Sequence, residues 1–284
     1  MPITLSCLSF NIWDLPLWLP QLKRKQRLSK LPQQIGALSP DLICLQESFT
    51  VKHRQKILAD LPKEYCCAGS ELSRWMLPLL RADRTGGLAV MSRFAFEQYH
   101  FVEHARVPRM RFDERLGRKG FVISLIRTTV GLICAVNAHL YAGRSERETG
   151  IRLQQLEILF SHLRQHCPAE TPIILAGDFN ASPTTHFPLN TRHELTPEYE
   201  RIVAEGFVDT LPRFDAEAIT YTGRENVYAK LVVDASETPQ KLDYIFYRSG
   251  GNLKIATREA RVVFNRGDFL SDHNGVFCKL EISE

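Results

Sequence analysis

The chain lacks any apolar run of the roughly 18 residues that a helix needs to cross a bilayer. It has no Cys-x-x-Cys pair, which argues against a structural zinc site. It also lacks a strong excess of one charge, because 36 Lys and Arg residues stand against 32 Asp and Glu residues and the formal net charge is only +4. That balance is not the one typical of proteins that coat nucleic acids, and it favours a polyanionic partner only weakly.

The N-terminal segment has no positively charged region ahead of an apolar one, so we predict no secretory signal peptide. The seven cysteines are an odd number, and several lie in apolar strand-like runs, as Cys44 and Cys134 do. We interpret the cysteines as buried, inert thiols in a reducing compartment. The expected location is the cytoplasm or the periphery of a membrane, with export by a route lacking a cleavable signal as the alternative.

Strand-like apolar runs alternate with amphipathic helical patterns along the whole chain. The two clearest helical patterns cover 21–38, where Pro32 is expected to break the helix, and 145–165, where Ser145 and Glu148 form a capping box. No linker divides the chain. We therefore predict one domain over residues 1–284, an α/β sandwich with helices on the outer faces of packed sheets, and a monomer. The predicted strands lie at 3–11, 42–47, 87–92, 120–127, 131–139, 172–178, 241–248 and 273–282.

Polar residues that can bind a metal or carry a proton follow several of these apolar runs. Neighbouring strands bring their ends to one rim of a sheet, so these side chains are expected to meet there. Carboxylates at such density repel one another and need a cation. Their oxygen ligands suit Mg²⁺, with Mn²⁺ or Ca²⁺ as alternatives, better than zinc. The residues in question are Asn11, Glu47, His139, Asp178, Asn180, Asp243, Asp272 and His273.

The segments that carry these residues resemble the signature blocks of the endonuclease/exonuclease/phosphatase superfamily, in the order of that family. The resemblance implies a four-layered α/β sandwich with two packed mixed β-sheets, and metal-dependent hydrolysis of a phosphoester. The blocks are Ser9-Phe10-Asn11-Ile12-Trp13, Leu45-Gln46-Glu47, Gly86-Gly87-Leu88-Ala89-Val90, Asn137-Ala138-His139-Leu140, Gly177-Asp178-Phe179-Asn180, Leu242-Asp243-Tyr244-Ile245 and Ser271-Asp272-His273.

The resemblance also implies which residues bind the metal. Glu47 would be the principal ligand, Asn11 would lie beside it, and Asp272 would approach the metal or the attacking water. Many nucleases of the family have an Asp two residues after this Asn, where this chain has Trp13. Asp14 is a poor replacement because side chains alternate in direction along a strand. The number of metals therefore stays open.

The remaining site residues would handle the proton and the phosphate. His273 would be the general base that takes a proton from the attacking water, and Asp243 would orient it. Asp178 would position the nucleophile or the leaving group. Asn180 would donate a hydrogen bond to the transition-state oxygens, and His139 would bind the phosphate.

Within the superfamily, the sequence looks most like the neutral sphingomyelinases. These have an Asn-x-His-Leu-x-Ala block, here residues 137–142, and an Asp-x-x-x-x-Lys-Gly block. This chain has Lys119 and Gly120, but Glu114 stands at the matching spacing and Asp113 is one residue further away. Lys119 would then lie near the active site, with a simple turn lysine as the alternative.

Two apolar segments with tryptophans suit a membrane–water boundary. Residues 13–20 contain Trp13 and Trp18 directly after Asn11, and Trp75 begins an apolar segment that is flanked by arginines. Packing of both segments into the core is the alternative interpretation.

We therefore expect a Mg²⁺-dependent phosphodiesterase that hydrolyses a phospholipid head group at a membrane surface, in the manner of a sphingomyelinase or phospholipase C. The alternative is a nuclease of the same superfamily that acts on DNA or RNA. A third hypothesis is a catalytically inactive scaffold that binds lipid or protein, and the complete set of site residues argues against it.

Overall fold

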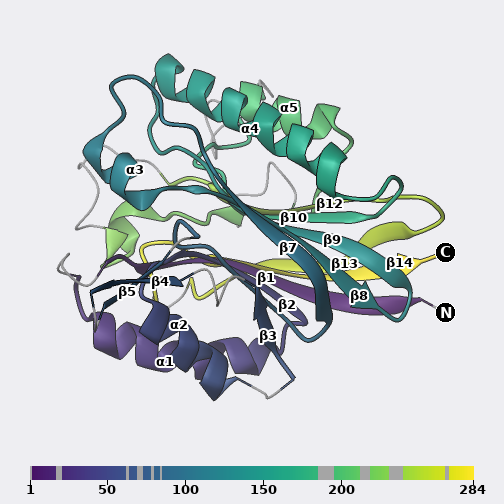
Figure 1. Cartoon of the computed structure of the whole chain (residues 1–284), viewed down its shortest axis with the longest axis horizontal. Coiled ribbons are helices and arrows are strands. Elements are labelled where there is room, and N and C mark those ends of the chain that lie inside the picture. The colour runs from purple at the N-terminus through teal and green to yellow at the C-terminus, as the bar shows by residue number, and fades with distance from the viewer. Residues whose placement is uncertain are drawn as a thin grey trace.

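The computed structural model describes residues 2–16, 21–61, 64–68, 73–77, 80–83, 85–184, 195–211, 218–229, 239–265 and 269–284, with only the backbone given for 73–77, 80–83 and 224. Within these residues, two six-stranded mixed sheets pack face to face (Figure 1). Helices cover the outer face of each sheet, so the predicted four-layered α/β sandwich is confirmed.

The first sheet has the order β13–β14–β1–β2–β6–β3, with β1 parallel to β2 and antiparallel to β14. Helices α1 (Arg24–Leu38) and α2 (Val51–Asp60) cover it. Its strands are β1 (Ile3–Asp14), β2 (Leu42–Ser48), β3 (Cys66–Ala68), β6 (Ala89–Ser92), β13 (Lys254–Val263) and β14 (Gly275–Ser283).

The second sheet has the order β11–β12–β10–β9–β8–β7, with β10 parallel to β9 and antiparallel to β12. Its helices are α4 (Glu146–His166) and α5 (Pro197–Ala204). Its strands are β7 (Ala95–Glu103), β8 (Gly120–Thr128), β9 (Gly131–His139), β10 (Ile173–Asp178), β11 (Val208–Asp209) and β12 (Asp243–Arg248). Outside the sheets lie the pair β4 (Ser73–Leu77) and β5 (Leu80–Asp83), helix α3 (Phe112–Gly117) and the 3₁₀ turn η2 (Gly223–Glu225).

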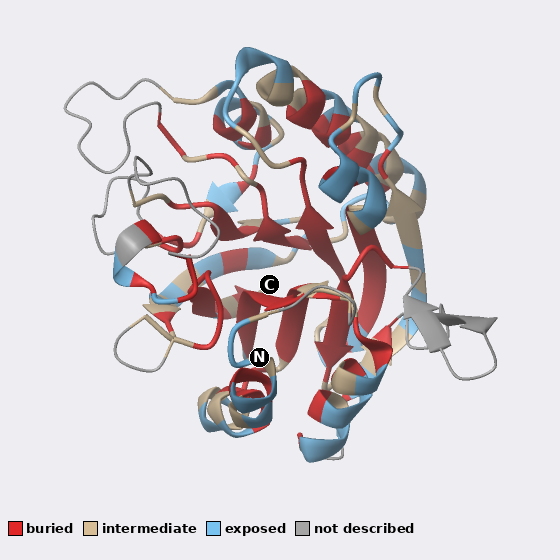
Figure 2. Ribbon diagram, turned by 90° about the vertical axis from the view of Figure 1, so that its left-hand side faces the viewer, coloured by how far each residue is buried: buried red, intermediate tan, exposed pale blue. Residues whose placement is uncertain are grey.

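Every predicted strand is a strand in the structure, and the strands that the sequence missed in the two sheets are the edge strands β3, β7, β11 and β13. The core between the sheets explains the difference. Central strands are covered on both faces and read as apolar runs, whereas the exposed and half-buried residues of β7 interrupt its pattern. Figure 2 shows the central strands as buried and the helices as buried on one side only.

Two local predictions have opposite outcomes. The capping box of α4 is present, with the backbone N–H of Ser145 donating to Glu148 Oε2 at 2.7 Å. The expected break at Pro32 was wrong, because α1 continues through it to Leu38. Leu28, Leu31 and Ile35 pack on the outer face of the first sheet, and this burial outweighs the lost backbone hydrogen bond.

The prediction that all cysteines are thiols was also wrong. Cys134 on β9 forms a disulfide with Cys167 at the end of α4. Cys7, Cys44 and Cys278 are free and buried, as expected.

A buried histidine makes the stability of the fold depend on pH. His104 is buried against Phe121, and burial lowers its pKa to about 3. The unfolded chain takes up this proton below pH 6.5 while the folded chain does not, so stability present above that pH is lost as the pH falls. Between pH 7 and pH 5 the loss is roughly 2 kcal/mol.

We predict that His104→Leu flattens the decrease in unfolding free energy between pH 7 and pH 5, as measured by urea denaturation at each pH. His100→Leu, at an exposed position on β7, is the control and should keep the wild-type slope. Equal slopes in wild type and His104→Leu would rule out this account.

Candidate active site

Side-chain alternation along the strands explains why the site residues meet. On β9, Ile133 and Ala135 point into the core between the sheets, and His139 lies on the same face of the strand. On β10, Ala176 is followed on that face by Asp178. The face that is apolar in the middle of each strand therefore becomes polar at its end.

The same rule places residues from the neighbouring strands. On β1, Cys7 is in the inter-sheet core, and Asn11 is four residues further along the same face. On β12, Asp243 precedes the core residue Ile245 by two. In the sheet ladder Asp178 is paired with His139 on one side and with Asp243 on the other. The end of β9 and the start of β12 in the second sheet, together with the end of β1 in the first sheet, thus converge around Asp178.

Glu47 reaches the site by a departure from this rule. Gln46 occupies the inward position on β2 and donates to Asn137 Oδ1 in the other sheet at 2.7 Å, so regular alternation would turn Glu47 toward the helices. Glu47 instead has φ 51°, a left-handed conformation that is uncommon for this residue type. Its side chain lines the cavity at the end of the sandwich.

That cavity has a volume of about 640 Å³ and combines polar and apolar walls. Asn11 and Asp243 lie behind its surface and contact the residues that line it. The predicted site residues on its wall are Glu47, Lys119, His139, Asp178, Asn180, Asp272 and His273. The apolar part of the wall is formed by Trp13, Leu15, Pro16, Phe49, Leu116 and Leu242.

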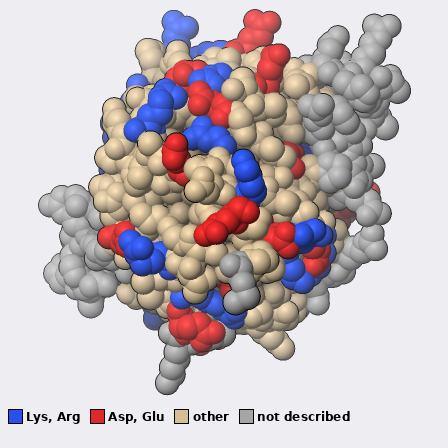
Figure 3. Space-filling model, turned by 90° about the vertical axis from the view of Figure 1, so that its right-hand side faces the viewer, with Lys and Arg blue, Asp and Glu red and all other residues tan. Residues whose placement is uncertain are grey.

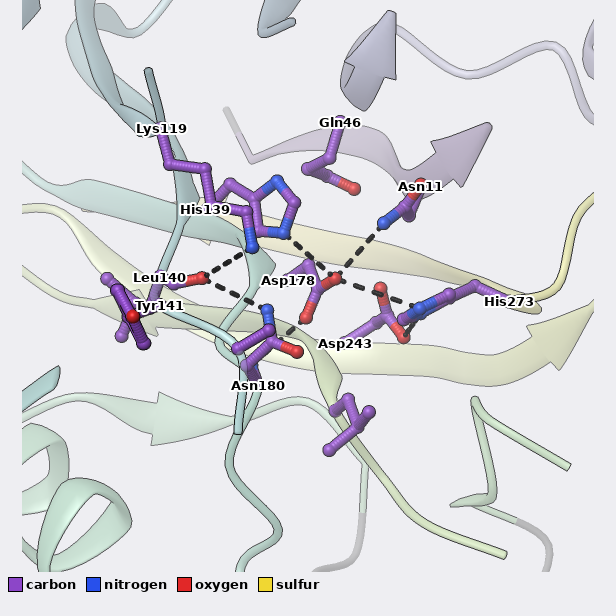
Figure 4. A network of polar contacts seen from close by, with 12 residues as sticks. Asn11, Gln46, Lys119, His139, Leu140, Tyr141, Asp178, Asn180, Asp243 and His273 are labelled. Atoms are coloured by element: carbon purple, nitrogen blue, oxygen red, sulfur yellow. Dashed lines mark hydrogen bonds and ion pairs between the residues drawn. The ribbon is translucent and has the colours of Figure 1, made fainter. Parts of the chain in front are cut away.

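Asp178 is the centre of the polar contacts in Figure 4. Its Oδ2 accepts a hydrogen bond from Asn11 Nδ2 at 3.1 Å and lies 3.4 Å from His139 Nε2 and 3.8 Å from His273 Nε2. Its Oδ1 accepts from the backbone N–H of Asn180 at 3.0 Å. One carboxylate therefore holds four of the predicted residues in place.

His273 and Asp243 form a buried pair. His273 Nδ1 lies 2.8 Å from Asp243 Oδ2, and Asp243 is fixed in turn by its backbone N–H donating to Thr220 Oγ1. Burial opposes a charge on His273, but the carboxylates of Asp243 and Asp178 outweigh it and raise the pKa of His273 well above its usual range. Nε2 of His273 points to the cavity side, toward Asp178.

His139 has the opposite electrostatic character. Its burial, followed by the positive charge of Lys119, lowers the pKa of His139 well below the usual range. The ring is therefore neutral at pH 7, and it offers a hydrogen bond to a phosphate but no full positive charge.

The carboxylates of Glu47 and Asp272 form one candidate set of donors for a hard cation. Burial and the negative charge of Asp272 raise the pKa of Glu47 to about 7, and burial also raises the pKa of Asp272. Burial is the largest cause of both shifts, and for Glu47 the negative charges of Asp272 and Asp178 add to it, which a divalent cation would relieve. The oxygen donors at this position fit Mg²⁺, Mn²⁺ or Ca²⁺.

A second group of potential ligands overlaps the first. One ligand atom each from Asp178, Asp243 and His273 lies within 4.8 Å of the others. However, His273 Nδ1 and Asp243 Oδ2 are already paired with each other in a hydrogen bond, which leaves them less available to a metal. Glu47 and Asp272 are the alternative pair of oxygen donors, and both line the cavity.

Lys119 lies in the cavity wall rather than at a free turn. Its Nζ donates to Glu114 Oε1 at 2.8 Å and to the backbone carbonyl of Leu140 at 3.3 Å. Glu114 is buried and is the residue at the matching spacing, whereas Asp113 is exposed and pairs with Arg111. In this chain Glu114 thus occupies the position that the related block gives to Asp.

Three tryptophans were predicted to contact the substrate or a membrane, and the structure describes the side chain of only one of them, Trp13. Trp13 is only 7% exposed, and its ring stacks with the guanidinium of Arg27 at 4.8 Å while also lining the cavity. Trp18 lies outside the described residues, as does the side chain of Trp75 on β4. Asp14 accepts hydrogen bonds from Thr50 at the start of α2, so it faces away from the site as predicted.

Arg27 is a positioning residue that the sequence did not reveal. It is fully buried under the site, and it donates to the carbonyls of Ile12, Trp13 and Leu270. These bonds join the end of β1 to the segment that carries Asp272 and His273. In the sequence Arg27 is one of several basic residues on an amphipathic helix, so no local signal distinguishes it.

Comparison with known families agrees with this geometry. A model of the endonuclease/exonuclease/phosphatase family matches residues 8–273, and the chain belongs to that family. Its members are metal-dependent phosphodiester hydrolases, and the chain is an enzyme of this class. Protein angel homolog 2 of Danio rerio is 28% identical over 204 residues, which are 64% of this chain and 34% of that protein. The chain thus spans about a third of that relative's length.

Several solved structures share the fold. Sphingomyelinase C from Streptomyces griseocarneus superposes with a TM-score of 0.69 at 18% identity, over 98% of this chain and 99% of that one. A beta toxin variant from Staphylococcus aureus with bound magnesium ions gives 0.68 at 19%, over 97% and 99%. TDP2 of D. rerio, complexed with a single-strand DNA product, gives 0.67 at 17%, over 98% of both chains. Among the described residues, no helix combines the length and apolar character that a bilayer crossing requires.

The buried His273–Asp243 pair leads to a direct prediction. Asp243→Asn keeps the shape of the side chain but removes the charge that orients and stabilises the imidazolium, so kcat for a soluble phosphodiester should fall roughly 10²- to 10⁴-fold. Steady-state hydrolysis of bis(p-nitrophenyl) phosphate with Mg²⁺ measures this. Asp60→Asn, at the exposed end of α2, is the matched control. A variant with wild-type kcat would show that the pair has no part in the reaction.

Proposed function

We propose that the enzyme is a Mg²⁺-dependent phosphodiesterase that hydrolyses the head-group phosphodiester of a phospholipid, in the manner of a sphingomyelinase or phospholipase C. The observation that carries the proposal is the mixed wall of the cavity. The His273–Asp243 pair and the carboxylates lie on one part of it, and Trp13, Phe49 and Leu116 lie on another. A phosphodiester with an apolar alcohol needs both kinds of surface.

We assign the metal to Glu47 as principal ligand, with Asp272 and Asn11 beside it. When bound, the ion supplies positive charge at the phosphoryl oxygens and offsets the carboxylates that raise the pKa of His273. Asn11 supports this position through its hydrogen bond to Asp178.

The chain's own residues then divide the reaction between them. His273, held at Nδ1 by Asp243, receives at Nε2 the proton of the water that attacks phosphorus in line with the leaving group. Asp178 positions that water or the leaving oxygen, since it lies between His273 and His139. Neutral His139 and the amide of Asn180 donate hydrogen bonds to the phosphoryl oxygens.

Lys119 adds positive charge at the same wall. Its Nζ and Asn180 Nδ2 both donate to the carbonyl of Leu140, so two donors are held at one edge of the cavity (Figure 4). We assign Lys119 to the phosphate side of the substrate, where its ion pair with Glu114 fixes its position.

A nuclease is the second candidate. Arg111 and Arg144 also line the cavity and suit a nucleic-acid backbone. The fold shared with TDP2 in its DNA complex is compatible with it. The aliphatic part of the wall, Leu15, Pro16, Leu116 and Leu242, favours the lipid, because nucleobases stack on aromatic rings and gain little from aliphatic side chains.

The test is a side-by-side comparison of sphingomyelin and phosphatidylcholine vesicles, plasmid DNA and RNA, each with Mg²⁺ or EDTA. We expect Mg²⁺-dependent cleavage of a vesicle lipid, with Glu47→Ala and His273→Ala each reducing the rate by roughly 100-fold or more. Rapid cleavage of DNA or RNA with inert vesicles would select the nuclease instead. Inactivity on every substrate would exclude both the lipid and the nucleic-acid proposals.

A further inference from the structure

Helix α3 exposes two large apolar side chains next to the cavity. Phe112 is 74% exposed and Leu116 is 43% exposed, and Phe112 is the most exposed large hydrophobic side chain among the described residues. The two are four positions apart, so they lie side by side on one face of the helix. Single exposed apolar residues are ordinary, but an adjacent pair at the mouth of a cavity requires an explanation.

The orientation of α3 is fixed by its opposite face. Glu114 is buried, pairs with Lys119 and accepts the backbone N–H of Ala142 at 3.1 Å. Positions two residues before and after Glu114 lie about 200° around the helix, on the far side. The anchor of α3 thus holds Phe112 and Leu116 toward solvent, and they cannot turn inward without breaking a buried ion pair.

The exposed pair is continuous with the mouth of the cavity. Leu116 and Gly117 line the cavity, and the half-buried Leu15 and Pro16 at the end of β1 line it as well. An apolar surface that covered α3 would therefore lie directly over the entrance.

The charge around α3 is strongly positive. Residues 105–119 contain six basic and two acidic residues, an excess equal to the formal charge of +4 of the whole chain. Arg106, Arg109 and Arg115 are exposed and make no ion pair with the described residues. The opposite end of the molecule, which carries the chain termini, intersperses both signs of charge (Figure 3).

We propose that α3 docks the enzyme onto a bilayer that contains anionic phospholipid. Phe112 and Leu116 would enter the interface, and Arg106, Arg109 and Arg115 would contact the negatively charged head groups. The inference rests on the proposed function, because docking at α3 places the mouth of the cavity at the lipid head groups. Binding itself requires no catalysis.

The docking surface is tested by co-sedimentation with phosphatidylcholine vesicles prepared with and without phosphatidylserine. Wild type is expected to bind the anionic vesicles more tightly, Phe112→Ser to reduce that partitioning about tenfold, and the double variant Arg109→Gln/Arg115→Gln to remove the preference for phosphatidylserine. Val208→Ser is the matched control, since Val208 is 48% exposed on β11, the edge strand opposite β7 in the second sheet.

Hydrolysis of soluble bis(p-nitrophenyl) phosphate by Phe112→Ser should equal that of wild type, which separates docking from catalysis and confirms folding. If Phe112→Ser loses vesicle binding while no lipid is hydrolysed by wild type, the docking surface stands and the proposed substrate fails. If Phe112→Ser binds anionic vesicles as wild type does, the docking proposal is overturned whatever the substrate. Binding of single-stranded DNA in place of vesicles, with the same dependence on Phe112, would also overturn it.

Discussion

The crowding of buried carboxylates at one end of the sandwich is the constraint on which the site depends. Glu47, Asp178, Asp243 and Asp272 converge where water is largely excluded. Burial raises the pKa of Glu47, Asp243 and Asp272, and the charges of neighbouring carboxylates add to the rise for Glu47 and Asp243. A fold selected for stability alone would replace several of them with apolar residues. Their presence together is the physical reason to assign a cation and a reaction to this place.

The two sheets make that crowding possible because they are joined rigidly just beneath it. Asn137 Nδ2 donates across the sheet interface to the carbonyls of Leu45 and Ala89, and Gln46 donates back to Asn137 Oδ1. These bonds lie between the apolar core and the polar cavity. Arg27 adds a second connection, between the end of β1 and the segment before His273. Both sets of contacts limit how far the carboxylates can move apart.

The sequence predicted the features that follow from local pattern. The central strands are recognisable because burial on both faces makes them continuous apolar runs, and the site residues because each stands at the end of such a run. Edge strands escaped prediction because solvent covers part of them, as in β7. Arg27, the hydrogen bond from Ala142 to Glu114 and the pairing of Cys134 with Cys167 depend on contacts between distant segments, which no local pattern encodes. The helix through Pro32 shows tertiary burial outweighing a local preference.

The most direct measurement compares the thermal unfolding of wild type and Glu47→Gln in EDTA and in Mg²⁺. If Glu47 is part of a crowded metal site, the variant should be at least as stable as wild type in EDTA, because one of the repelling carboxylates is gone. Mg²⁺ at a hundredfold excess over its Kd should stabilise wild type by roughly 2.7 kcal/mol, a rise of several degrees in Tm, and the variant by much less. A variant that is less stable in EDTA and gains as much from Mg²⁺ as wild type would contradict the assignment of the metal to this site.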